Sequence, residues 1–139
     1  MKKIIFILAA AAALMLTGCE KAFNEYLSVT LHDQATLEEI FSQELGGLGI
    51  ADWTTPKGGY FISYNTMEGC AKEVVSKCAK AGVILTNAGA TWPGGNDPHD
   101  SNIRVAPSFP PLEDLKTAAR VLALCTKLVS VQKLLEEAE

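Results

Sequence analysis

The stretch Gly82–Pro111, GVILTNAGATWPGGNDPHDSNIRVAPSFPP, decides the fold that the sequence predicts. Two short apolar runs, at residues 83–86 and 102–106, favour β-strands. Between them lies a loop at residues 87–101 that is rich in Gly, Pro, Asn and Asp. Loops of this length are uncommon in compact domains and often carry function. We therefore expect the functional residues near the second strand, where this loop ends.

Arg104 lies within the second apolar run. A buried charge is costly unless it has a partner, and arginine is suited to bidentate binding of a carboxylate or phosphate. The spacing leaves two interpretations open. Arg104 forms a structural salt bridge with Asp97, Asp100 or Glu113, or it binds the carboxylate of a substrate.

The rest of the chain adds one strand and three helices to this stretch. Helical spacing of apolar residues and a cluster of aromatic and β-branched residues define them. The expected elements are a helix at 37–45 with Thr36 as its N-cap, a strand at 59–64, a helix at 67–81 capped by Asn65 or Thr66, and a last helix that begins at Pro111. Residues 48–57 are expected to be a connector. The order predicts an α/β class, specifically a two-layer α+β unit with helices flanking a short three-stranded sheet.

Composition excludes several classes of function. The chain has 139 residues, enough for one domain, and a formal net charge of −4. Without Lys2 and Lys3 the body has 10 basic and 16 acidic residues, a net charge of −6, which argues against a nucleic-acid partner. The two histidines, His32 and His99, have no ligand partners at the spacing of zinc sites. We therefore expect no metal site and no self-contained hydrolase.

The N-terminus has the pattern of a targeting segment. Two lysines precede an apolar run at residues 4–16, which is short for a membrane span. The following LTGC resembles a bacterial lipobox, in which Cys19 is lipidated and anchors the chain to a membrane. We expect a signal segment at residues 1–19 and a polar connector at residues 20–36. The alternative interpretation of the apolar run is a buried helix.

The other cysteines favour a different compartment. Cys70 and Cys78 lie on one expected helix about 12 Å apart, beyond disulfide reach, and Cys125 completes an odd number. Free cysteines in apolar surroundings are typical of cytosolic proteins. The leader thus predicts a membrane-anchored lipoprotein, whereas the cysteines predict a cytoplasmic protein behind a leader that is an artefact of the gene prediction.

Two long strings carry a family resemblance. TTPKGGYFISYNTMEGCAKEVV and AGVILTNAGATWPGGNDPHDSNIRVAPSFPPLEDL resemble the C-terminal small domain of pyridoxal-phosphate-dependent aminotransferases of fold type I, in a bacterial aspartate-aminotransferase-like branch. The resemblance covers residues 37–139. It implies an α/β small domain, in agreement with the order of elements expected from the residues.

The resemblance also implies roles for individual residues. Arg104 matches the arginine that binds the α-carboxylate of the substrate, and Phe61 and Asn102 match positions at the substrate site. Asn102, Gly89 and Ser108 are expected to shape the loop that presents the arginine. Amino acids and 2-oxo acids are the implied substrates, and family members are homodimers.

The catalytic parts of the family lie in a large domain that precedes the small one. That domain supplies the Schiff-base lysine and the phosphate-binding loop for pyridoxal phosphate. We therefore expect no catalytic residue in this chain, no bound cofactor, and no transaminase activity from the chain alone. Two interpretations remain: a fragment from a truncated or chimeric gene, or a membrane-anchored lipoprotein that uses the domain as a non-catalytic binding or structural module.

Overall fold

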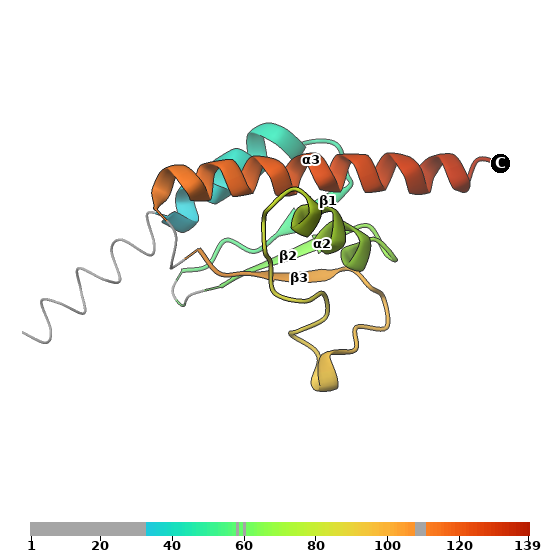
Figure 1. The fold of residues 1–139 in the computed structure, drawn as a ribbon, viewed down its shortest axis with the longest axis horizontal. Coiled ribbons are helices and arrows are strands. Elements are labelled where there is room, and N and C mark those ends of the chain that lie inside the picture. The colour runs from blue at the N-terminus through green and yellow to red at the C-terminus, as the bar shows by residue number, and fades with distance from the viewer. Residues whose placement is uncertain (1–32, 58, 60, 108–110) are drawn as a thin grey trace, which may run out of the picture. The chain divides into compact units, whose positions relative to one another are not determined.

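The computed structural model describes residues 33–57, 59, 61–107 and 111–139. The expected signal segment, Cys19 and most of the connector therefore lie outside the described residues, as does Ser108. The described chain contains a helix at residues 33–45, three strands, the helix α2 and the long helix α3 (Figure 1). Thr36 lies inside the first helix and does not cap it, so the predicted helix start was wrong.

The sheet has three antiparallel strands in the order β1, β2, β3. They are β1 at Ala51–Trp53, β2 at Ile62–Thr66 and β3 at Asn102–Val105. Trp53 pairs with Tyr64 across the first junction, and Ser63 pairs with Arg104 across the second. The expected α+β class with a short three-stranded sheet and flanking helices is confirmed.

Two of the strand predictions were wrong. The stretch at residues 83–86 is not a strand, because it leaves α2 with a hydrogen bond from the Val83 N–H to the Cys78 carbonyl and then has no regular structure. Val83 and Leu85 pack against the core without joining a ladder, whereas Ile84 is exposed. The third strand is instead β1, which lies in the expected connector. Three residues are too few to show alternation, and pairing with β2 holds them extended.

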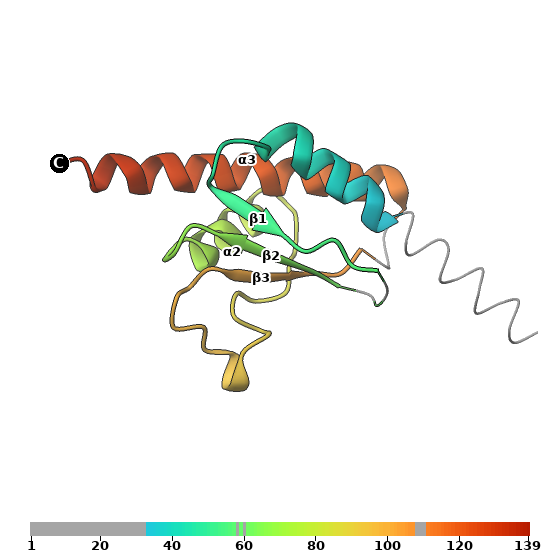
Figure 2. The same ribbon diagram turned by 180° about the vertical axis from the view of Figure 1, so that it is seen from behind.

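The helices flank the sheet. α2 spans Ala71–Lys80 and α3 spans Leu112–Glu136. Asn65 and Thr66 do not cap α2, because its first N–H groups bond to Asp100: the carbonyl accepts from Ala71 at 2.8 Å and the carboxylate from Lys72 at 3.1 Å. Both ribbon views show α3 running along the sheet beside the first helix, with its C-terminal turns extending beyond the sheet (Figures 1 and 2).

The core lies between one face of the sheet and these helices. Its members are apolar and buried; the largest fully buried ones are Tyr64, Phe41, Leu45, Ile62, Ile103, Leu122 and Val74. The rings of Phe41 and Tyr64 are 5.1 Å apart, centroid to centroid, and the Tyr64 hydroxyl bonds to Thr126 of α3 at 2.9 Å. This hydrogen bond links α3 to the sheet within the core, where an unpaired buried hydroxyl would be costly.

Candidate functional site

Polar side chains occupy the face of the sheet opposite the core. Side chains alternate along a strand, so Tyr64 and Ile103 point into the core while Ser63, Asn102 and Arg104 lie on the other face. Arg104 is half-buried there, with Ser63 directly across on β2. Pairing of β2 with β3 thus gathers the three predicted site residues, Arg104, Asn102 and Phe61, at one side of the sheet.

Arg104 has no carboxylate partner within the described part of the chain. Its guanidinium carbon lies 4.7 Å from the centroid of the Phe61 ring, a cation–π contact. Its Nε is buried without a hydrogen-bond partner in the same residues. A buried polar atom without a partner is uncommon in folded proteins, and this one belongs to a side chain suited to anions.

The three carboxylates that sequence spacing offered to Arg104 are occupied elsewhere. The Asp97 carboxylate accepts from the backbone N–H groups of a neighbouring turn. Asp100 faces Lys72 at 3.9 Å, and Glu113 accepts from Lys116 at 2.7 Å. The structural salt bridge of Arg104 with Asp97, Asp100 or Glu113 is therefore absent from the described residues.

Asn102 is 8% exposed and lies at the centre of a hydrogen-bond network. Its amide nitrogen donates to Ser63 Oγ at 2.8 Å and to Asn65 Oδ1 at 2.6 Å. Its amide oxygen accepts from Thr91 Oγ1 at 2.6 Å. Asn65 in turn donates to Asp52 on β1 at 2.8 Å. Both amide hydrogens of Asn102 are thus used within the protein, and the network ties all three strands to the long loop.

Asp97 organises the loop before β3. Its carboxylate is 5% exposed and accepts from the N–H groups of His99, Ser101 and Asn102, each at 2.9 Å. These bonds, with the Ser101 bond first, lower the pKa of Asp97. Gly89 packs against the same turn with a φ of +77°, and a Cβ there would lie 2.9 Å from the Gly95 carbonyl oxygen.

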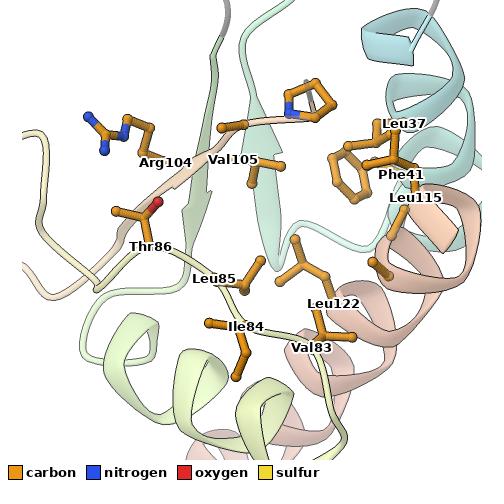
Figure 3. A pocket seen from close by; sticks show the side chains of 14 residues that line it. Leu37, Phe41, Val83, Ile84, Leu85, Thr86, Arg104, Val105, Leu115 and Leu122 are labelled. Carbon is orange, nitrogen blue, oxygen red and sulfur yellow. The ribbon is translucent and has the colours of Figure 1, made fainter. Parts of the chain in front are cut away.

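An apolar pocket of about 130 Å3 lies behind Arg104. Its interior is lined by residues of the first helix, residues 83–86, β3 and α3, and Figure 3 shows Leu85, Val105 and Leu122 among them. In Figure 3 the Arg104 side chain is directed away from this interior. Among the described residues that line the pocket, Arg104 is the one ionisable residue, and its guanidinium lies away from the apolar interior.

The described residues include no cluster of three or more side chains able to hold a metal ion. Asp97 serves as a turn-forming group, because its carboxylate accepts from the N–H groups of three residues that follow it. The roles of Ser63 and Thr91 were missed by sequence analysis. Only the strand register could have revealed them, because it places Ser63 beside Asn102 and brings the loop within reach.

Comparison with known proteins connects this domain to a family. The aspartate amino-transferase family matches residues 16–138, nearly the whole chain. The chain belongs to the aspartate aminotransferase family. Its three helices and three-stranded antiparallel sheet match the C-terminal small domain of fold-type-I aminotransferases.

Two similar proteins show what share of a relative's length the chain covers. A putative aminotransferase of Mycolicibacterium smegmatis is 45% identical over 118 residues, which cover 85% of this chain and 28% of the relative. The aspartate aminotransferase of Corynebacterium glutamicum is 42% identical over 94 residues, covering 68% of this chain and 22% of that protein. The chain therefore spans about a quarter of the length of these curated relatives.

Solved structures give the same match. An aspartate transaminase from Corynebacterium glutamicum aligns with a TM-score of 0.73 and 38% identity over 76% of this chain and 25% of that one. The α-aminoadipate aminotransferase LysN of Thermus thermophilus, complexed with N-(5'-phosphopyridoxyl)-L-leucine, aligns with a TM-score of 0.73 at 16% identity, over 86% and 30% of the two chains. At that identity the second comparison shows the fold alone.

Among the described residues, those that line the pocket beside Arg104 include no lysine that could carry pyridoxal phosphate. The cofactor needs a lysine for a Schiff base and a cradle for its phosphate. Five lysines of the described chain are engaged in ion pairs with carboxylates: Lys72, Lys77, Lys116, Lys127 and Lys133.

None of the described helices has the length and hydropathy of a membrane span.

Proposed function

We propose that this chain supplies the substrate-carboxylate arginine of an aminotransferase, and that it does not transaminate alone. The observation that supports this proposal is the state of Arg104. Its guanidinium stacks on Phe61, has a buried Nε without a partner, and has no carboxylate partner in the described chain. In this proposal the terminal nitrogens of Arg104 are the donors that bind an external anion.

The chemistry of Arg104 suits the α-carboxylate of an amino acid or a 2-oxo acid. A guanidinium offers two parallel N–H donors that match the two oxygens of a carboxylate. The site is formed on strands, which place the arginine more precisely than a loop does. In this proposal Arg104 binds and orients the substrate, and Asn102 and the loop it anchors hold β3 in position.

In this proposal the cofactor chemistry belongs to the part of the relatives' sequence that this chain does not match. Pyridoxal phosphate acts as an electron sink for carbanions when it is bound. We infer that its lysine and phosphate site lie in the other three quarters of the relatives' length. Amino-acid and 2-oxo-acid substrates and a homodimeric assembly are likewise proposals carried over from the family.

A binding and turnover experiment tests the proposal. The purified chain is titrated with 2-oxoglutarate while the amide resonances of β3 are followed by NMR, and Arg104→Ala and Arg104→Lys are titrated in parallel. We expect saturable shifts for the wild type, weaker binding for the lysine variant because it lacks the planar fork, and none for the alanine variant. Binding that is unchanged in Arg104→Ala refutes the carboxylate role.

Activity is measured in the same preparation with aspartate, 2-oxoglutarate and added pyridoxal phosphate. We expect neither turnover nor the absorbance of a Schiff base. As a control, the homologous full-length aspartate aminotransferase shows both under the same conditions. Turnover by the 139-residue chain would show that it holds the cofactor without the matched relatives' remaining length.

The LTGC motif supports a second proposal, that the domain is a membrane-anchored, non-catalytic lipoprotein module. Metabolic labelling with a fatty acid tests it, with Cys19→Ser as the matched control. Label on the wild type and none on the variant would support the anchor. An unlabelled cytoplasmic product that retains residues 1–19 would contradict it and favour a leader that is an artefact of the gene prediction.

A further inference from the structure

Phe61 lies on the polar face of the sheet although it is a large aromatic residue. It precedes β2, two residues from Ser63, and Ser63 pairs with Arg104. Residues diagonal to each other on neighbouring strands are within reach of long side chains. The Phe61 ring accordingly meets the Arg104 guanidinium at 4.7 Å, while 47% of the Phe61 residue stays exposed to solvent.

We propose that Phe61 is a positioning residue that holds the Arg104 guanidinium ready for a carboxylate. This inference rests on the proposed function of Arg104. The guanidinium carbon lies over the Phe61 ring, and Nε is buried without a hydrogen-bond partner among the described residues. In this proposal the terminal nitrogens form the edge that binds the carboxylate, and the contact with the ring limits the positions that the guanidinium can take.

No other described side chain holds the guanidinium in this way. The neighbouring polar groups of Ser63 and Asn102 are bonded to each other at 2.8 Å. No carboxylate of the described chain forms an ion pair with Arg104. The orientation of the arginine therefore depends on the Phe61 ring. Without this ring the Arg104 side chain would populate several rotamers.

Pre-organisation determines the size of the effect. A ligand that must first immobilise a flexible arginine binds more weakly, because the loss of side-chain entropy makes the free energy of binding less favourable. For one such side chain this corresponds to a loss of affinity of about threefold to tenfold. Leucine keeps apolar bulk at residue 61 but lacks the π face that attracts a cation, so Phe61→Leu removes the stack with little change in volume.

The experiment compares Phe61→Leu with Phe61→Tyr, and uses Trp92→Leu as a control that removes a similarly exposed aromatic residue from the long loop. The first measurement needs no ligand. NMR of the Arg104 side chain reports the ring-current shift and the mobility of the Nε–H group. We expect Phe61→Leu to abolish the shift and raise the mobility, and the other two variants to behave as the wild type.

The second measurement is the affinity for 2-oxoglutarate. We expect the threefold to tenfold loss in Phe61→Leu and recovery in Phe61→Tyr. Unchanged Arg104 signals in Phe61→Leu overturn the inference, as does unchanged affinity in a variant that has lost the stack. If the wild type binds no 2-oxo acid, the proposed function of Arg104 fails and the inference fails with it, even where the stack is seen. If Arg104→Ala abolishes binding while Phe61→Leu leaves the affinity unchanged, the proposed function of Arg104 stands and the role of Phe61 is refuted.

Discussion

Replacement of Asn102 by alanine tests whether this side chain serves the protein or the ligand. In the structure Asn102 makes three side-chain hydrogen bonds, to Ser63, Asn65 and Thr91. A net contribution of roughly 0.5–1.5 kcal/mol for each bond gives about 1.5–4.5 kcal/mol in total. The three partners are partly or fully exposed and can bond to water once Asn102 is lost. We therefore expect a decrease of about 2 kcal/mol in the free energy of unfolding.

Urea unfolding followed by tryptophan fluorescence measures this change, because Trp53 packs at 5.5 Å from the core ring of Phe41. The matched control is Asn65→Ala, which removes two bonds, to Asp52 and Asn102, and is expected to cost less. The m-value should stay constant, since neither change alters the area exposed on unfolding. A domain of ordinary stability, about 5–15 kcal/mol, stays folded after either substitution.

Two results would refute this reasoning. If Asn102→Ala changes the free energy of unfolding by less than about 0.5 kcal/mol, the three hydrogen bonds of Asn102 do not stabilise the fold. If the variant keeps its stability but loses binding of 2-oxoglutarate, Asn102 contacts the ligand directly, as the family resemblance implied. The expected pattern is the opposite, with reduced stability and an affinity that remains measurable wherever the variant is folded.

Three further predictions concern the loop and the thiols. Gly89→Ala should reduce stability by roughly 2 kcal/mol in urea unfolding, because its φ of +77° and the contact with the Gly95 carbonyl both oppose a Cβ; an unchanged midpoint contradicts this. The lowered pKa of Asp97 stabilises the folded state fully above the ordinary pKa of about 3.9, and this stabilisation is lost as the pH falls through the pKa of the folded protein. Hydrogen exchange should therefore show weaker amide protection in the loop at acid pH. Asp97→Asn should remove this pH dependence of the protection. Burial raises the pKa of Cys78 to about 12, so iodoacetamide at pH 8 should leave it unmodified until urea unfolds the chain, which mass spectrometry detects; rapid labelling of the folded protein contradicts this.

Local patterns in the sequence predicted α2, β3 and α3 because each depends on nearby residues. Helical spacing of apolar side chains marks α2 and α3, and the apolar run around Arg104 marks β3. The failures have a common cause. Residues 83–86 have strand propensity but no strand to pair with, whereas β1 has little propensity and is held extended by β2. Pairing between distant segments, which no local pattern reports, decided both cases.

The same distinction applies to the candidate site. Sequence alone pointed to Arg104 as a charge in an apolar run, and the family strings named Phe61 and Asn102 beside it. It could not choose between a salt bridge and a ligand for Arg104, since Asp97, Asp100 and Glu113 were equally available by spacing. Only the tertiary structure shows those carboxylates bonded to other groups and Phe61 stacked on the guanidinium. Sequence determines which chemical groups are present, whereas strand register and loop closure determine which of them meet, because contacts across a sheet depend on residues far apart in the chain.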